Sequence, residues 1–327
     1  MRNPLIRPFN AAAAGFSCMN GNILRRTNVH GMPVALGIEL TNHCNLKCPE
    51  CNSGSGLMTR NRGFISTGLF EKIIAEAGPY LYNLNLYFQG ESMMHPQFFA
   101  ILEKCSNIYT TLSTNGHFLS EENAEKITAS PLRKLIVSLD GMDKQAYNYY
   151  RVNGDLDKVL AGIRYISESV KRNHSDLKLV IQFLVYRKNE QQLNEAKIFA
   201  GSVGASFQVK SMQIINKDSY ETWLPSQGKF SRYVKEGSGY AIKNRLQNRC
   251  VRLWFNPVIT WDGKVLPCCF DKNADHVMGD MNQDSLRNIW IGEKYMKFRK
   301  DLLTGRRKIE ICRNCTSGIQ ERVPIPS

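Results

Sequence analysis

The sequence lacks any hydrophobic run long enough to cross a membrane. Nowhere in its 327 residues does an apolar stretch approach the roughly 18 to 20 residues of a membrane span. A secretory signal is also missing, because Pro4, Pro8 and Asn10 interrupt the N-terminus and no clean hydrophobic region follows. Ten cysteines are too few for a disulfide scaffold of this length. These absences exclude membrane-spanning and disulfide-framework proteins.

Disorder is excluded as well, since 43% of the residues are hydrophobic and can fill a sizeable core. Acidic residues are fewer than basic ones: the chain has 29 Asp and Glu and 43 Lys and Arg, which gives a formal net charge of +14. This surplus suits an anionic partner, or serves solubility alone. It is densest over Lys297–Lys308, where cations would also suit the C-terminal end of a helix. No element interleaves aromatic and basic residues in a stripe, which argues against nucleic acid as a partner.

From residue 34 onward, strand-like segments alternate with helix-like ones. The expected strands cover 34–40, 81–89, 109–113, 135–139, 177–185 and 206–212. The expected helices cover 67–77, 96–105, 121–129, 144–170 with a break near Gly154, and 190–200. Such alternation predicts an α/β fold with a parallel sheet. Six units fall short of the eight of a closed barrel, so we expect a partial (β/α)6 TIM-like barrel.

Composition divides the chain into four expected segments. They are an N-terminal extension (1–33), the partial barrel (34–215), a polar linker or covering loop (216–249) and a small cysteine-rich α+β domain (250–327). Within the last, Asp262 and Gly263 predict a tight hairpin turn. Ser285 is a predicted N-cap for a helix running to about Leu303, with Gly305 just beyond it.

Three cysteines follow the first expected strand: Cys44, Cys48 and Cys51. Loops after strands of parallel β/α folds are where active sites are built. Three thiolates on a [4Fe–4S] cluster would leave one iron open for a substrate or cofactor. A zinc site completed by His43 is the alternative, although adjacent His43 and Cys44 would struggle to chelate one tetrahedral ion.

This Cx3Cx2C loop resembles the signature of the radical S-adenosylmethionine (SAM) superfamily, and the likeness continues over about 34–212. The resemblance implies SAM contacts at the ends of later strands, with Gly90 and Glu91 in a Gly-Gly-Glu-Pro-like motif that holds the methionine amino group. The further implied contacts are Ser113, Asn115, Ser138, Asp140, Arg151 and Gln182, together with Asn189. Ser138 and Arg151 are similar to the ribose- and carboxylate-binding pair of the sulfatase-maturase branch.

The motifs depart from the family at three positions. Gln89 and Ser92 replace a glycine and a proline, and Glu50 stands where an aromatic residue often packs near adenine. The residues of these motifs could instead have purely structural roles. The strand-end polar residues could form turns, and Arg151 could pair with Asp155 or Asp157 on a helix face.

A second cysteine group follows the linker: Cys250, Cys268, Cys312 and Cys315. The hairpin between the first two would let them approach each other, and four thiolates complete one site. By ligand count alone, iron–sulfur and structural zinc are equally open. The spacing resembles the SPASM extension of radical SAM enzymes in its shortened twitch form, as in 2-deoxy-scyllo-inosamine dehydrogenases, which implies one auxiliary [4Fe–4S] cluster. Cys269 is surplus to this set, and Cys18 and Cys105 are expected to be free thiols.

The resemblance implies an enzyme that cleaves SAM reductively to a 5′-deoxyadenosyl radical and removes hydrogen from its substrate. A fully ligated auxiliary cluster favours a role as electron acceptor. We therefore expect a two-electron oxidation of a sugar- or aminocyclitol-like small molecule. The positive net charge of the chain favours an anionic substrate. Loading both clusters takes the net charge from +14 to about +11. No base is assigned. Oxygen-sensitive clusters imply a cytoplasmic setting and a flavodoxin- or ferredoxin-type reductant.

Two other functions stay open. One is modification of a peptide or protein, although the extension over 1–33 is too short for a leader-recognition domain. The other, from a different class, is a non-catalytic zinc protein that binds nucleic acid through its surplus of Lys and Arg.

Overall fold

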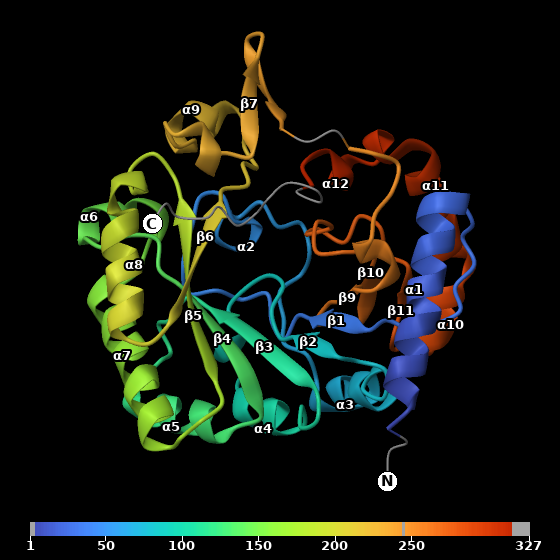
Figure 1. Ribbon diagram of the computed structural model, residues 1–327, viewed down its shortest axis with the longest axis horizontal. Helices are drawn as coiled ribbons and strands as arrows, with labels where there is room; N and C mark the ends of the chain where they lie inside the picture. The colour runs from blue at the N-terminus through green and yellow to red at the C-terminus, as the bar shows by residue number, and fades with distance from the viewer. Residues whose placement is uncertain (1–3, 244–245, 316–327) are drawn as a thin grey trace. The chain divides into compact units, whose positions relative to one another are not determined.

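The computed structural model describes residues 4–243 and 246–315, where strands and helices alternate as predicted (Figure 1). The strands are β1 (Ala35–Ile38), β2 (Asn83–Asn85), β3 (Tyr109–Thr114), β4 (Leu132–Ser138), β5 (Lys178–Val185) and β6 (Ser206–Ser211). Helices α3 (Thr67–Ala77), α4 (Phe98–Glu103), α5 (Glu121–Ala129), α6 (Lys144–Tyr150), α7 (Leu156–Arg172) and α8 (Leu193–Ser202) lie between them. Parallel pairs join β1 to β2, β2 to β3, β4 to β5 and β5 to β6. The predicted α/β fold of six strand–helix units is confirmed.

Polar caps explain where these helices begin. Ser66, Ser120, Asp143 and Asp155 are the N-caps of α3, α5, α6 and α7, and each side-chain oxygen accepts a hydrogen bond from the backbone N–H three residues on. The break expected near Gly154 separates α6 from α7. Among the described residues, no helix is long and apolar enough to cross a membrane.

The chain forms two compact units, and neither is contiguous in the sequence. The terminal unit takes the described residues of 1–43, 58–111 and 246–317, and the central unit takes those of 44–57 and 112–245. Strand β3 begins in the terminal unit and ends in the central unit. The four segments expected from composition stay a prediction.

In the terminal unit, the C-terminal module extends the sheet that contains β1. Strand β9 (Val258–Ile259) pairs with β1 in parallel, β10 (Lys264–Leu266) pairs with β9 antiparallel, and β11 (Gly279–Asp280) pairs with β10. The predicted hairpin turn joins β9 to β10, and Gly263 adopts a φ of 91° there. The C-terminal cysteines are thus attached to the first strand of the fold by backbone hydrogen bonds.

The helix predicted from Ser285 to about Leu303 is in fact two helices. Ser285 caps α10 (Leu286–Ile291) as expected, but Gly292 is extended and separates it from α11 (Glu293–Gly305). Gly305 is the last residue of α11 and does not lie beyond it. A 3-10 turn, η6 (Arg306–Lys308), and α12 (Glu310–Arg313) follow and carry the chain to the last cysteine pair.

Two regions hold structure that the sequence did not reveal. The N-terminal extension contains α1 (Ile6–Leu24), and the expected linker contains α9 (Tyr220–Trp223) and a hairpin of β7 (Tyr233–Glu236) and β8 (Gly239–Ile242). The hairpin was missed because its strands are short and no regular alternation of apolar and polar residues follows its turn at Gly237 and Ser238. Helix α1 was missed because the small residues 11–15 interrupt the regular spacing of large apolar side chains that would have predicted a helix.

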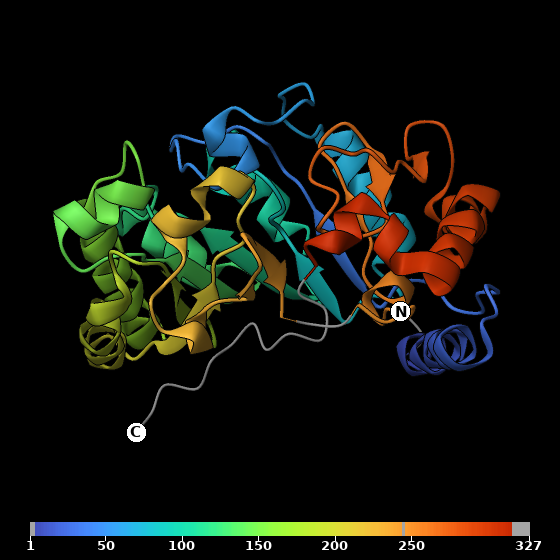
Figure 2. The same cartoon turned by 90° about the horizontal axis from the view of Figure 1, so that it is seen from above.

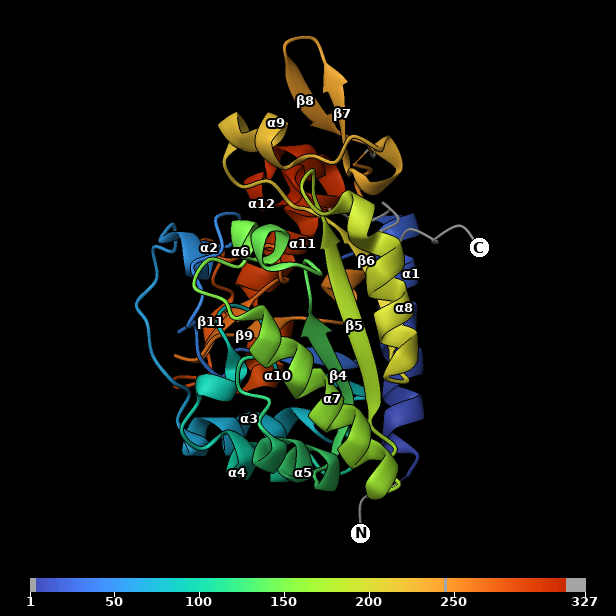
Figure 3. The same ribbon diagram turned by 90° about the vertical axis from the view of Figure 1, so that its left-hand side faces the viewer.

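In the central unit, helices α7 and α8 lie beside strands β4 to β6 (Figure 3). Strand residues Val137, Ile181 and Phe183 are fully buried and form part of the core. Ser138, the last residue of β4, is paired in register with Gln182, which lies three residues before the carboxyl end of β5. Parallel strands present these ends at one edge, so polar side chains there can share a site.

Candidate active site

The three cysteines of the first group lie in one short loop of the central unit. Cys51 immediately precedes a single helical turn, α2 (Asn52–Ser55), and its backbone N–H donates to Cys48 O at 3.3 Å. The loop is fastened from outside as well, because Lys47 N donates to Val152 O at 3.0 Å. Cys48 is buried, while Cys44 and Cys51 are partly buried. Three sulfurs are therefore offered by one tightly held loop.

Two polar side chains from later strands point their donors at these sulfurs. Asn115, just after β3, has its Nδ2 3.9 Å from Cys44 Sγ and 2.8 Å from Asn45 Oδ1. Arg151, just after α6, has its Nη1 3.9 Å from Cys48 Sγ. Burial raises the pKa of the Cys48 thiol to about 12, and the positive charge of Arg151 opposes that shift. N–H donors around thiolate ligands are the outer contacts that orient ligands and tune a metal centre.

Arg151 is itself held by Asp140, and not by Asp155 or Asp157. The distance from Arg151 Nε to Asp140 Oδ2 is 2.6 Å, and the other carboxylate oxygen accepts a hydrogen bond from Leu184 N at 2.8 Å. Asp140 is only 1% exposed. Two predicted cofactor contacts are thus paired with each other, beside the cysteine loop.

Asn189 has a structural role and is not available as a polar contact. Its Nδ2 donates to Asp140 O and Leu184 O at 2.9 and 2.8 Å, and its Oδ1 accepts from Tyr186 N at 2.8 Å. These hydrogen bonds tie the Asn189 side-chain amide to the backbone around the end of β5.

Ser113, another predicted SAM contact, is half-buried near the end of β3.

Gly90 and Glu91 belong to the terminal unit, after β2. Gly90 has a φ of 78°, and a Cβ there would lie 2.5 Å from Thr41 O and 2.6 Å from His43 O, so only glycine fits. Glu91 N donates to His43 O at 2.8 Å, and the buried Glu91 carboxylate accepts from Met93 N. The ring of His43 stacks on Phe64 at 4.8 Å.

Glu50 has a role that the family resemblance did not suggest. It is buried, and its Oε2 accepts from Ile215 N at 2.5 Å and from Asn216 N at 3.3 Å, while Oε1 accepts from the Ser219 hydroxyl. The carboxylate joins the cysteine loop to the segment after β6. In place of an aromatic surface, this position supplies a polar clamp.

Aromatic side chains pack against the same loop. Tyr150, Tyr186 and Trp223 form a buried cluster with Leu46 and Cys48. Their ring centroids are 5.6 to 5.8 Å apart in edge-on or tilted arrangements. This packing keeps water from the inner side of the loop.

The second cysteine group converges in the terminal unit. Cys250, Cys268, Cys312 and Cys315 line one small cavity. The remaining walls are apolar or cationic: Leu253, Phe270, Phe298, Leu302, Ile311, Arg252 and Arg306. A single zinc ion would need its sulfurs within about 2.3 Å of one point. Among the residues that the structure describes, no three Cys, His, Asp or Glu side chains are already arranged around a single point.

The sequence did not reveal that Arg306 belongs to this site. Its Nη2 lies 3.2 Å from Cys315 Sγ and its Nη1 lies 2.8 Å from Arg249 O. Burial alone would lower the pKa of Arg306, but Cys250, Cys315 and Cys312 raise it above its usual value. Conversely, burial raises the pKa of Cys312 to about 12, and Arg306 opposes that shift. Arg306 precedes Cys312 by six residues, and this spacing alone did not predict that its side chain reaches the cysteines.

The three remaining cysteines are not among the residues that line this cavity. Cys269 accepts a hydrogen bond from Arg252 Nη1 at 3.0 Å, Cys18 accepts one from Asn22 Nδ2 at 3.2 Å, and Cys105 is buried behind α4. Asn22 also accepts from Cys250 N at 2.9 Å, so α1 supports the first ligand of the group.

Comparison with protein families identifies the domains in which the two cysteine groups lie. Residues 38–196 match the radical SAM superfamily, and residues 250–316 match the SPASM iron–sulfur cluster-binding domain. The chain is a radical SAM protein with a SPASM domain. The predicted resemblance is confirmed, and with it the implied SAM, [4Fe–4S] cluster and auxiliary iron–sulfur cofactors.

Relatives of this radical SAM protein differ in what they act on. The mycofactocin maturase MftC of Mycolicibacterium smegmatis is 27% identical over 187 residues, which are 55% of this chain and 45% of that protein. The S-adenosyl-L-methionine-dependent 2-deoxy-scyllo-inosamine dehydrogenase of Niallia circulans is 22% identical over 288 residues, 86% of this chain and 91% of that one. The chain thus spans about half the length of relatives such as MftC.

A solved structure shares the fold. Streptococcus suis SuiB bound to its precursor peptide SuiA has a TM-score of 0.64 and 16% identity, over 89% of this chain and 73% of that one. At that identity the likeness concerns the fold alone.

Proposed function

We propose that this radical SAM enzyme oxidises a small hydroxylated molecule of the sugar or aminocyclitol class by two electrons. One observation carries the proposal: among the described residues that line the C-terminal cavity, the four thiols are the only metal-ligand side chains. A cluster held by Cys250, Cys268, Cys312 and Cys315 has no open iron, so it can exchange electrons but cannot bind substrate directly.

In this proposal Cys44, Cys48 and Cys51 hold the cluster that binds SAM. The bound cofactors supply the one-electron cleavage of SAM that starts hydrogen abstraction. The chain's own residues hold that chemistry in place. Arg151 and Asn115 donate toward the cluster sulfurs, Asp140 fixes the Arg151 side chain, and Gly90 and Glu91 form the turn proposed for the methionine amino group. Ser113, Ser138 and Gln182 are proposed as further SAM contacts.

The substrate class is supported by the dehydrogenase relative, whose alignment covers 86% of this chain and 91% of that protein. The net charge of +14 favours an anionic substrate. A small acidic flavodoxin or ferredoxin is the proposed reductant.

The test separates SAM cleavage from substrate oxidation. Anaerobically reconstituted protein is supplied with dithionite, SAM and 2-deoxy-scyllo-inosamine or related phosphorylated sugars, and 5′-deoxyadenosine and ketone are both measured. A Cys312→Ala, Cys315→Ala variant should retain SAM cleavage and about four of about eight irons, yet lose ketone formation. Full ketone formation by that variant would refute the electron-acceptor role, and Cys105→Ala is the control.

Peptide modification is the second candidate, since MftC and SuiB are named as a maturase and a precursor-peptide complex. Mass spectrometry of a genome-neighbouring precursor peptide after the same incubation distinguishes the two. A mass loss of about two hydrogens or a crosslink in the peptide, with no small-molecule ketone, would replace the first proposal.

A further inference from the structure

Helix α1 of the terminal unit is oriented opposite to the usual amphipathic helix. The face that packs on the protein is small or polar: Asn10, Ala14, Ser17, Asn20 and Gly21 are buried. The face that points away is large and apolar. Surface helices ordinarily bury their apolar stripe, so this arrangement needs an explanation.

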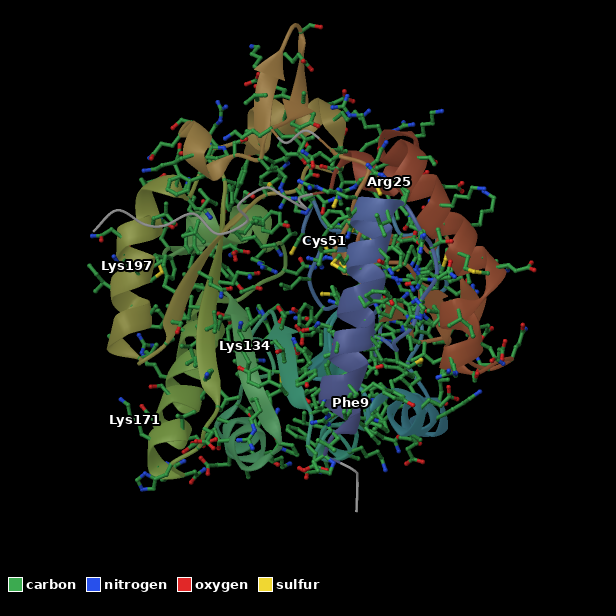
Figure 4. The ribbon with its side chains drawn as sticks, turned by 45° about the vertical axis from the view of Figure 1, so that its right-hand side comes forward. Phe9, Arg25, Cys51, Lys134, Lys171 and Lys197 are labelled. Atoms are coloured by element: carbon green, nitrogen blue, oxygen red, sulfur yellow. The ribbon has the colours of Figure 1, made fainter. Side chains whose placement is uncertain are left out.

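The outward stripe is continuous along the helix. Its exposed members follow helical spacing and include Leu5, Phe9, Phe16, Met19, Ile23 and Leu24. Phe9 and Ile23 are each 69% exposed. Figure 2 looks along α1 at the margin of its unit, and Figure 4 shows Phe9 toward the start of α1 and Arg25 at its end. Contiguous exposed apolar surface of this kind marks an interaction site.

The inner face is fixed, so α1 cannot turn its apolar stripe inward. Asn10 exchanges two hydrogen bonds with the backbone of Met32, at 3.1 and 2.7 Å. The Ser17 hydroxyl accepts from His30 N at 2.9 Å. Gly21 lies so close to Trp254 that a Cβ there would be 1.9 Å from the indole ring. These contacts hold the apolar stripe on the side of α1 that faces away from the unit.

The charge around the stripe has one sign. Residues 1–33 contain no Asp or Glu. Arg7 lies near the start of the helix, and Arg25 and Arg26 follow its end, where the Arg25 guanidinium donates to Asn248 O. Asn248 also bonds Thr304 O and Arg306 N, which brings the exposed Arg307 and Lys308 to the same end.

A groove beside the stripe combines apolar side chains with a positive charge. Leu5, Phe9, Ala13 and Tyr80 form apolar walls, and exposed Arg287 lies on its rim. The groove holds about 910 Å³ of solvent-open space. Within the described residues, Arg287 makes no ion pair.

We propose that α1 docks the protein on an anionic lipid bilayer, with the stripe in the headgroup–acyl boundary and the exposed Arg26 and Arg287 side chains on lipid phosphates. Helices that lie in this plane present Phe and Leu to the acyl chains and cations to anionic lipids. A second copy of the chain fits less well. In either orientation a pair of α1 helices would bring cationic ends together or leave them uncompensated, since the helix has no acidic residue. The proposal is independent of the substrate.

The experiment is co-sedimentation of the reconstituted holoenzyme with vesicles. Phosphatidylcholine vesicles are compared with vesicles containing about one third phosphatidylglycerol. Wild type should pellet with the anionic vesicles and be released as salt rises from about 0.1 to about 1 M. A Phe9→Ser, Phe16→Ser, Ile23→Ser variant should partition at least about tenfold less. Arg26→Gln with Arg287→Gln should weaken binding to the anionic vesicles only.

Ile198→Ser is the matched control, because Ile198 is an isolated apolar residue on α8 that is 65% exposed. It should bind as wild type does, and unchanged iron content and circular dichroism should show that all variants are folded. Wild type that stays in the supernatant with both vesicle types would overturn the proposal. So would light scattering that finds a dimer for wild type and a monomer for the triple serine variant, with no vesicle binding.

Discussion

The Asp140 carboxylate lies 2.6 Å from Arg151 Nε, so two residues expected to contact a cofactor are first of all partners of each other. Their pairing holds the guanidinium of Arg151 within 3.9 Å of Cys48 Sγ. A strand-end carboxylate thereby determines where a positive charge stands beside the cysteine loop.

Removing Arg151 should destabilise the protein strongly. Arg151→Met leaves Asp140 buried without its cation, and we expect the free energy of unfolding to fall by about 3–5 kcal/mol. Denaturant unfolding of the metal-free protein measures this. Arg133→Met breaks a comparable pair with Asp176 at the exposed surface and should change stability by less than about 1 kcal/mol. Equal losses in both variants would contradict the role assigned to burial.

Glu50→Ala should loosen the segment after β6. The substitution leaves the N–H groups of Ile215 and Asn216 without their carboxylate acceptor. Hydrogen–deuterium exchange should rise over 214–219, and the cluster should bleach faster in air. Glu190→Ala is the matched control, since Glu190 accepts equivalent bonds from Ser226 and Gln227 at the surface. Unaltered exchange over 214–219 in Glu50→Ala would argue against the clamp.

Arg306→Met should make the auxiliary cluster harder to reduce. A buried guanidinium 3.2 Å from Cys315 Sγ favours the more negative, reduced state. We expect the midpoint potential to fall by roughly 60 mV, about a tenfold change for one electron. Spectroscopic redox titration measures it. Arg307→Met removes an exposed neighbouring charge and should leave the potential nearly unchanged; a matching shift there would mean that overall charge, and not the contact, sets the value.

The stability of the central unit should fall in mild acid because of His117. Burial lowers the pKa of His117, and its Nε2 accepts a hydrogen bond from Asp155 N at 2.8 Å. Below the ordinary pKa of about 6.5, the unfolded chain binds a proton that the folded chain resists, so stability is present above that pH and is lost below it.

The melting temperature of the wild type should therefore drop as the pH falls from about 7 to about 5.5. His117→Gln should show a flatter profile over that range. His174→Asn, at an exposed position with φ 47° that suits asparagine, should keep the wild-type profile. A wild-type slope in His117→Gln would assign the pH dependence to other groups.

Much of the fold was readable from the sequence because its signals are local. The helices over 67–77 and 121–129 were predicted with their observed bounds, since each has a serine cap and a regular apolar face. The hairpin turn at Gly263 was predicted from the Asp262–Gly263 pair, which is typical of tight turns between antiparallel strands. The cysteine spacings likewise pointed to the radical SAM and SPASM domains that the family comparison finds.

The sequence determined the chemistry that this protein can hold: seven cysteines in two groups, the strand-end polar residues and a surplus of positive charge. Only the tertiary structure decided how these residues are partnered. Asp140 and Arg151 are paired because β4 and α6 end side by side, and Arg306 reaches Cys315 because Gly292 divides the last helix. The outward stripe of α1 could not be foreseen either, since periodicity gives a helix an apolar face but does not say which face the protein covers.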